Sequence, residues 1–354
     1  MKTLEECIAI ALHTPYAHGD PIATGILREY AEDYIVDEIP LLEPGGEGEH
    51  VWLKISKRHT NTDYVAKQLQ KLSKVKSMAV SYAGMKDRHA LTTQWFSVHL
   101  PGAEEPDWQS LATDDIEILE TKRHSRKLRR GTLLGNVFKI QVRDIDVDAE
   151  VLAQRVKSIN QGGVPNYFSR QRFGHSGANI NKAQAMFAGD RRVKRHQRSI
   201  YLSSARSMLF NHILAQRVEA GSWNALNVGD ICLRTGKRGF FHVEELSSEL
   251  LQRLVSGEIH PTAPLWGQGD LPVSGAIKEL EEQLPIDFPD WCVGLEKAGL
   301  KMERRALRLM PADFFAEKND EGVFISFSLP AGCYATSVIR ELFDTQDYNR
   351  FNKT

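Results

Sequence analysis

Strand-like segments in the first half of the chain, and again near its end, flank a long region that has few of them. Residues 51–56 and 323–329 both alternate apolar and polar side chains, which predicts strands that bury one face. Between 163 and 311 the sequence is typical of helices and loops. Because the last strand can pair with the first sheet, the pattern predicts an α+β fold with an insertion. The predicted domains are 1–162 with 312–354, and an inserted, mostly helical lobe at 163–311.

Shorter patterns predict the remaining elements. Val65, Leu69 and Leu72 fall on one face of a helix, which predicts a helix from Asn61 or Thr62 to about residue 74. Further strands are predicted at 34–36, 78–83, 95–100, 116–122 and 138–142. Further helices are predicted at 148–160, from Ser203 or Ser204 past residue 214, at 243–255, and at 337–343, where the last one closes the fold.

Composition is that of an ordinary globular protein. The 354 residues suffice for two domains, and no apolar run has the length that spans a membrane. The N-terminus lacks the basic and then apolar pattern of a signal peptide. The cysteines form no Cys-x-x-Cys pair, which argues against a zinc ribbon and a disulfide scaffold. They are Cys7, Cys232, Cys292 and Cys333. We therefore expect a cytoplasmic protein with reduced thiols.

The net charge of −1 hides an uneven distribution of charge. Residues 122–130 and 191–198 are strongly basic, whereas acidic residues gather at 279–282 and 287–290. A neutral protein with concentrated basic stretches can present a phosphate-binding face. A solvated charged surface is the alternative interpretation of each stretch.

A short charged turn follows the predicted strand at 78–83. Gly84 frees the backbone to turn, and Lys86, Asp87, Arg88 and His89 follow at once. A carboxylate among cations stays ionised, which is the state that a nucleophile or a general base requires. Alternatively, Asp87 only hydrogen-bonds to its own turn, as Asp often does.

Three more segments accompany this turn. They are Asn136-Val137-Phe138, the string Val-Pro-Asn-Tyr-Phe-Ser-Arg-Gln-Arg-Phe-Gly at 164–174, and Leu-Pro-Ala-Gly-Cys-Tyr-Ala-Thr-Ser at 329–337. In order and spacing, the four segments resemble the TruD family of tRNA pseudouridine synthases. The resemblance runs from about Gly25 to Leu342.

The resemblance implies both a fold and an activity. The fold is a pseudouridine synthase domain with a bent, mainly antiparallel sheet, interrupted by the family's own lobe. The activity is isomerisation of uridine to pseudouridine in tRNA, with uridine 13 of the D arm as the implied target. The reaction needs no metal and no nucleotide cofactor, because nothing is oxidised and nothing is added. No coiled-coil heptad is visible, so a monomer without an obligate protein partner is expected.

The resemblance also assigns roles to individual residues. The catalytic aspartate falls on Asp87 and its basic partner on Arg28, although Ala31 and Tyr34 replace a usual proline and phenylalanine nearby. The stacking aromatic falls on Phe138, which taken alone would be a core residue. Asn136, two residues away on the same side of a strand, matches the edge of a uracil.

Further residues are candidates for substrate binding. Lys86 could bind a phosphate or fix the turn. Asn166, Gln171 and Arg172 interleave with aromatic residues in a way that suits RNA contacts, or that forms a packed hinge.

Two other classes of function stay open. A non-catalytic RNA-binding or RNA-folding protein would also carry aromatic residues and basic loops. A hydrolase of glycosidic or phosphodiester bonds ranks last, because no second carboxylate and no metal cluster stands at a readable spacing.

Overall fold

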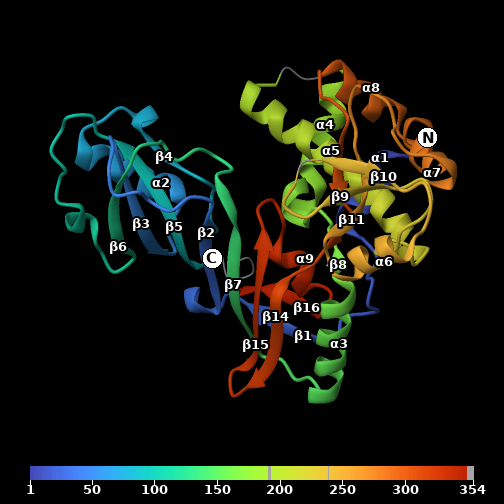
Figure 1. Ribbon diagram of the computed structural model, residues 1–354, viewed down its shortest axis with the longest axis horizontal. Coiled ribbons are helices and arrows are strands. Elements are labelled where there is room, and N and C mark those ends of the chain that lie inside the picture. Colours follow the sequence, from blue (N-terminus) through green and yellow to red (C-terminus); the bar gives the residue numbers. More distant parts are fainter. Residues whose placement is uncertain (190–192, 238, 349–354) are drawn as a thin grey trace. The chain divides into compact units, whose positions relative to one another are not determined.

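The structure is a computed structural model that describes residues 1–189, 193–237 and 239–348 (Figure 1). The chain divides into two compact units. Unit 1 comprises Met1–Asp20, Lys157–Met310 and Thr336–Glu341, and unit 2 comprises Pro21–Val156, Pro311–Ala335 and Leu342–Thr354. Residues 1–20, 157–162 and 336–341 were predicted to belong to the sheet domain, whereas the structure groups them with unit 1.

Unit 2 is built on one ten-stranded sheet. Its strands are β1 (Ala23–Leu27), β2 (Tyr34–Pro40), β3 (His50–Arg58), β4 (Val80–Tyr82), β5 (Leu91–His99), β6 (Ile116–His124), β7 (Leu133–Arg143), β14 (Ala312–Asn319), β15 (Gly322–Pro330) and β16 (Phe343–Asp347). The main path runs β14-β15-β7-β2-β5-β3-β6. Only β1–β16 and β2–β5 pair in parallel among the described strands. The predicted α+β class with a mainly antiparallel sheet is therefore confirmed.

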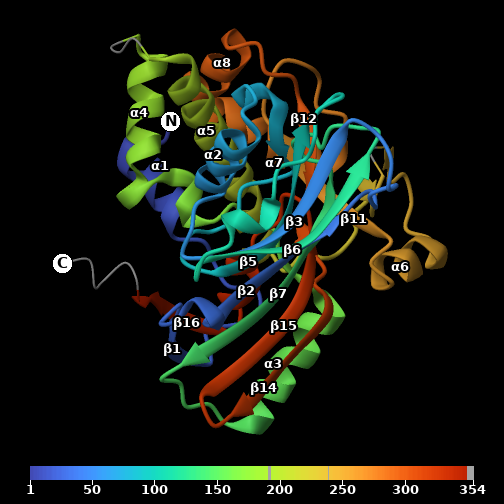
Figure 2. The same cartoon turned by 90° about the vertical axis from the view of Figure 1, so that its left-hand side faces the viewer.

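The strand that returns from the end of the chain joins this sheet as predicted. β15 pairs with β7 antiparallel, and the two run side by side in Figure 2. The register places Phe138 opposite Phe327 and Asn136 opposite Leu329. Gly135 allows this close approach, because a Cβ there would lie 2.1 Å from the Leu329 carbonyl oxygen.

The core of unit 2 lies under helix α2 (Thr62–Ser73). Val65 and Leu69 of α2 pack on the β3 face that carries Val51 and Leu53, so the predicted amphipathic helix is confirmed. The prediction that β3 buries only one face is wrong. Trp52 points to the other face and is also buried, because the loop that follows β6 covers it. Its indole N–H donates to the Arg126 carbonyl in that loop (2.9 Å).

Unit 1 is mainly helical. Its helices are α1 (Leu4–Leu12), α4 (Ala178–Phe187), α5 (Arg195–Glu219), α6 (Ser248–Val255), α7 (Gly275–Asp287), α8 (Pro289–Lys297) and α9 (Ala335–Ile339), and α3 (Ala149–Gly162) enters it from unit 2. A small sheet that the sequence analysis did not predict orders β10 (Phe240–His242), β9 (Ile231–Arg234), β11 (Ile259–Leu265) and β12 (Glu303–Ala306), and β8 (Val164–Pro165) pairs with β13 (Arg308–Leu309). Short 3-10 turns of unit 1 are η4 (Arg170–Phe173) and η5 (His175–Gly177), and those of unit 2 are η1 (Ala31–Asp33), η2 (Ser77–Ala79) and η3 (Trp108–Leu111).

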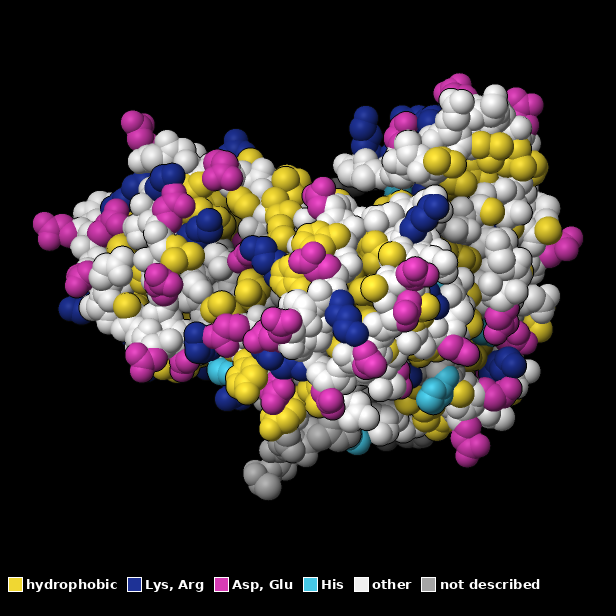
Figure 3. Space-filling view, turned by 90° about the horizontal axis from the view of Figure 1, so that it is seen from below, with side chains coloured by type: hydrophobic (Ala, Val, Ile, Leu, Met, Phe, Trp, Pro, Cys, Tyr) yellow, Lys and Arg dark blue, Asp and Glu magenta, His cyan; other side chains and the backbone are white. Residues whose placement is uncertain are grey.

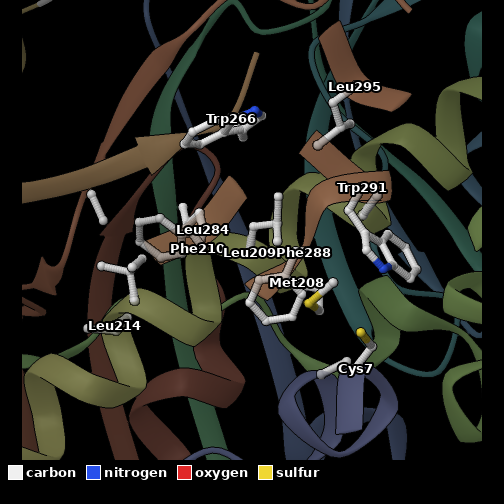
Figure 4. Close-up of a cluster of buried hydrophobic side chains, with 14 of the residues drawn as sticks. Cys7, Met208, Leu209, Phe210, Leu214, Trp266, Leu284, Phe288, Trp291 and Leu295 are labelled. Carbon is white, nitrogen blue, oxygen red and sulfur yellow. The ribbon is translucent and has the colours of Figure 1, made fainter. Parts of the chain in front are cut away.

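Helix α5 forms the centre of the unit 1 core. Figure 4 shows Met208 of α5 close to Cys7 of α1, with Phe288 and Trp291 beside them. Burial raises the pKa of the Cys7 thiol to about 11. All four cysteines are free thiols.

Three predicted helix boundaries are wrong. Helix α5 already begins at Arg195. Ser204 lies inside this helix, where its Oγ donates to the Ile200 carbonyl (2.9 Å), so it is not the cap. Helix α6 begins only at Ser248, where Ser247 caps it. The helix predicted at 337–343 ends at Ile339, and Phe343 starts β16, which closes the fold instead.

Candidate active site

The turn at 84–89 is held in place by side chains of two neighbouring elements in unit 2. The backbone N–H of Lys86 donates to Thr62 Oγ1 at the start of α2 (3.0 Å). Gln94 of β5 donates through Nε2 to the Gly84 carbonyl (2.9 Å), and Thr62 Oγ1 donates to Gln94 Oε1 (3.0 Å). Because Thr62 and Gln94 are both buried, the turn sits on a rigid support.

Arg28 and Asp87, the predicted catalytic pair, lie together. Arg28 Nη2 is 3.3 Å from Asp87 Oδ2, and Nη1 is 2.8 Å from Asp347 Oδ2. The Arg28 side chain is 6% exposed, whereas that of Asp87 is 47% exposed. A buried cation thus orients a carboxylate that is open to solvent. Arg28 also has a left-handed backbone (φ 61°), which is uncommon for a residue other than glycine.

Arg28 keeps its charge despite burial. Burial acts to lower its pKa, but Tyr34, Asp87 and Asp347 together raise the pKa above its ordinary value. The guanidinium carbon lies 3.9 Å from the centre of the Tyr34 ring. Burial in turn raises the pKa of Tyr34 to about 12. Tyr34 is therefore a neutral ring beneath the guanidinium.

Phe138, the predicted stacking aromatic, lies in a row of rings. Its ring is 5.4 Å from that of Phe327 at an interplanar angle of 27°, and it meets Tyr34 edge-on at 6.4 Å. Only 7% of Phe138 is exposed. Most of this ring is therefore packed against the protein, and its stacking on a base stays a prediction.

Lys86 does not reach toward solvent but into unit 2. Its Nζ lies 2.9 Å from Glu38 Oε2 of β2 and donates to Asn136 Oδ1 of β7 (2.6 Å). The side chains of Lys86 and Glu38 are 5% and 1% exposed. Of the two expectations for Lys86, this geometry favours the fixing of the turn over the binding of a phosphate.

Lys57 is a site residue that the sequence analysis missed. Its Nζ donates to the Thr60 carbonyl (2.7 Å) and to the Asp87 carbonyl (3.1 Å), so it holds the backbone of the turn at 84–89. A signal existed, because the alternation that buries Val51, Leu53 and Ile55 continues to position 57. A lysine on the apolar face of a strand indicates a specific partner.

Lys57 predicts a measurable pH dependence. Burial lowers its pKa from an ordinary value of 10.5 to about 8, against the opposing effect of Asp87. Between these two values the unfolded chain binds a proton that the folded protein does not, so this group makes stability rise with pH. The free energy of unfolding of wild type minus that of Lys57→Met should therefore increase from about pH 8 to about pH 10.5 in urea titrations. A difference that stays flat over this interval would contradict the assignment.

Asp347 is a second residue that the sequence analysis missed. It comes to Arg28 because β16 pairs in parallel with β1, with Asp347 opposite Leu27. Since residues 337–343 were expected to end the fold as a helix, no strand was predicted to deliver it. Nothing local in the sequence marks this carboxylate.

The other three predicted site residues belong to unit 1. Asn166 is buried, and both ends of its amide are used there: Nδ2 donates to the Ala306 carbonyl (2.9 Å) and Oδ1 accepts from Arg305 Nη2 (2.5 Å). Gln171 is exposed in η4. Arg172 donates through Nη1 to Ser203 Oγ (3.2 Å). Their contacts with RNA stay predictions.

The two basic stretches lie on different units. The exposed basic residues of 122–130 are Lys122, Arg126, Lys127, Arg129 and Arg130. Of 191–198, Arg191 and Arg192 lie outside the described residues, and the part from Arg195 onward begins α5. On the face in Figure 3, basic and acidic side chains are interspersed, as the near-zero net charge leads one to expect.

The described residues contain neither a metal cluster nor a membrane-spanning helix. Within 1–189, 193–237 and 239–348, no group of three or more His, Cys, Asp or Glu is placed to hold a metal ion. In the same ranges, no helix combines the length and apolar character needed to cross a membrane.

Comparisons with known proteins identify the family of the chain. Residues 13–191 and 179–342 match the family model for tRNA pseudouridine synthase D (TruD). The tRNA pseudouridine synthase D of Methylococcus capsulatus is 47% identical, with 94% of this chain and 96% of the relative covered. That of Aeromonas hydrophila is 46% identical, with 94% of both covered. A TruD structure from Methanosarcina mazei shares the fold, with a TM-score of 0.69 at 24% identity over 96% of this chain and 97% of that chain. The chain therefore belongs to the tRNA pseudouridine synthase D (TruD) family.

Proposed function

We propose that this protein isomerises uridine to pseudouridine in tRNA and that Asp87 is its catalytic carboxylate. One observation carries the proposal: Asp87, a half-exposed carboxylate on a rigid turn, pairs with the buried guanidinium of Arg28. Membership of the family supplies the reaction class, and the pairing supplies a group with the right charge and access.

The reaction breaks the bond between uracil N1 and ribose C1′, turns the base, and joins C5 to C1′. The hydrogen at C5 leaves as a proton and N1 gains one, so no redox change occurs. Attack at C1′, attack at C6 and removal of the 2′ proton all require one ionised carboxylate, and Asp87 supplies it in each case. Positive charge that develops at C1′ would be stabilised by the same group, as in glycoside hydrolysis.

The other residues divide into positioning and binding groups. Arg28 orients Asp87, and the buried ring of Tyr34 supports Arg28. Asn136 and Phe138 would contact the flipped base, which must leave its stack to be reached. Asn166, Gln171 and Arg172, together with the exposed cations of 122–130, are the proposed contacts to the tRNA around the D arm. We further propose that the enzyme acts in the cytoplasm as a monomer.

Release of tritium from tRNA carrying C5-labelled uridine tests this proposal. C5 must lose its hydrogen when it becomes the glycosidic carbon, so the label reports isomerisation directly. We expect release from wild-type tRNA and none from the same tRNA with cytidine at position 13. Release from both would retain the reaction but discard uridine 13. No release from any tRNA, with salt-sensitive binding intact, would indicate an RNA-binding protein without catalysis.

A further inference from the structure

The amide of Asn136 is held in one orientation by Lys86. The Lys86 ammonium lies 2.6 Å from Asn136 Oδ1, and an ammonium can only donate hydrogen bonds. The oxygen of the amide must therefore face Lys86, since the NH₂ group would meet another donor. Nδ2 is left at the opposite end of the amide, and it bonds to no residue of the described chain.

Lys86 is itself locked in place. Its ammonium pairs with Glu38 Oε2 (2.9 Å), and its backbone N–H is held by Thr62. Glu38 is fixed in turn, because Oε1 accepts the backbone N–H of Trp95 (3.2 Å). Both charged side chains are almost completely buried. A buried pair that loses one partner leaves an uncompensated charge, so an alternative arrangement of Lys86 is unfavourable.

We propose that Lys86, held by Glu38, makes Asn136 a pure hydrogen-bond donor toward the target base and thereby selects uracil over cytosine. The inference rests on the proposed function, and it assigns the base specificity to a pair that does not touch the base. Uracil carries carbonyl acceptors at C2 and C4, whereas cytosine shares the C2 carbonyl but carries an amino donor at C4, so the selection requires that Nδ2 faces C4 of the bound base. An Nδ2 donor is satisfied by a carbonyl and faces an unpaired donor when it meets the amino group.

The same arrangement suits a reaction that turns the base. When uracil rotates about its N3–C6 axis to bring C5 to C1′, the C2 and C4 carbonyls exchange places. A fixed donor then meets a carbonyl before and after the rotation. A fixed acceptor would meet an oxygen in both orientations, and cytosine would present its amino group in one of them. The orientation that Lys86 imposes on Asn136 is thus the one that both uridine and its product satisfy.

Binding measurements can isolate this effect from catalysis. In an Asp87→Asn background, the Kd would be measured for tRNA with uridine and for tRNA with cytidine at the target position. We expect the parent to prefer uridine by roughly tenfold or more, the size of a base-edge contact. Lys86→Met with Glu38→Gln removes the ion pair that orients Asn136 and leaves no buried charge unpaired. In this variant the ratio of the Kd for cytidine-containing tRNA to the Kd for uridine-containing tRNA should fall close to one, while tRNA binding is retained.

A matched control exists on the same two strands. Lys139 of β7 and Asp37 of β2 form an exposed pair at 3.8 Å that does not involve Asn136. Lys139→Met with Asp37→Asn should leave the ratio unchanged. If the Lys86 and Glu38 variant keeps the parent ratio, the inference is overturned.

A second variant covers the case in which the double variant fails to fold. Asn136→Asp keeps the shape, satisfies Lys86 and presents only acceptors, so it should invert the preference toward cytidine. Retained preference for uridine would overturn the inference. Tritium release by the wild type is measured in parallel: its absence refutes the proposed function, whereas release with an unchanged ratio refutes only the role of Lys86.

Discussion

Asp87→Asn is expected to lower the rate of tritium release by at least roughly 10³-fold, which is the scale for loss of a general base or of a group that stabilises developing charge. Asparagine has the same shape and can still contact Arg28, so the geometry of the turn should be retained. It has neither the charge nor the basicity that the reaction requires. Affinity for tRNA should stay the same or rise, because one negative charge is removed.

A control for Asp87→Asn lies in the same unit. The Asp37 side chain is 38% exposed and pairs with Lys139, much as Asp87 is 47% exposed and pairs with Arg28. Asp37→Asn should therefore release tritium at the wild-type rate. If Asp87→Asn were also fully active, the enzyme class would stand but another group would have to carry the chemistry.

The parts of the fold that the sequence predicted are those with local patterns. The α2 helix and the β15 strand follow from apolar spacing within a single segment, and both form as expected. The joining of β15 to β7 follows from the need to bury its apolar face. Helix starts were less predictable. Ser203 and Ser204 resemble caps in sequence, yet α5 continues through them.

The candidate site was predictable only where a motif marked it. Asp87 and Lys86 stand in one short charged turn, and Asn136 stands beside Phe138. The direction in which Lys86 points could not be predicted, because its partners Glu38 and Asn136 are 48 and 50 positions away and meet it only through the pairing of β2 with β7. Asp347 is further still from Arg28, 319 positions along the chain. These contacts depend on strand register, which no single segment encodes.

Arg28→Met is the other substitution with a large expected effect. It removes the cation between Asp87 and Asp347 and the contact with Tyr34. Because Arg28 acts through Asp87, we expect kcat to fall by roughly 10²-fold or more with little change in KM, as a misplaced catalytic group produces. Stability should fall by about 3 kcal/mol, toward the lower end for a broken buried pair, since Asp347 keeps access to solvent.

Arg143 provides the control that separates these two effects. It lies in unit 2, bridges Asp33 and Glu321 (2.8 and 3.2 Å), and is placed over the ring of Tyr30. Arg143→Met therefore removes the same kinds of contact without touching Asp87, and it should lower the melting temperature while kcat stays near that of wild type.

Arg28→Lys completes the test of orientation. Lysine keeps the charge, but one ammonium cannot replace two guanidinium nitrogens that reach separate carboxylates. Compared with Arg28→Met, we expect this variant to regain part of the lost stability but little of the lost kcat. If Arg28→Lys restored kcat, charge alone would suffice near Asp87, and the planar geometry of the guanidinium would not matter. If Arg28→Met and Arg143→Met reduced kcat equally, the loss would reflect general destabilisation of unit 2 and not the positioning of Asp87.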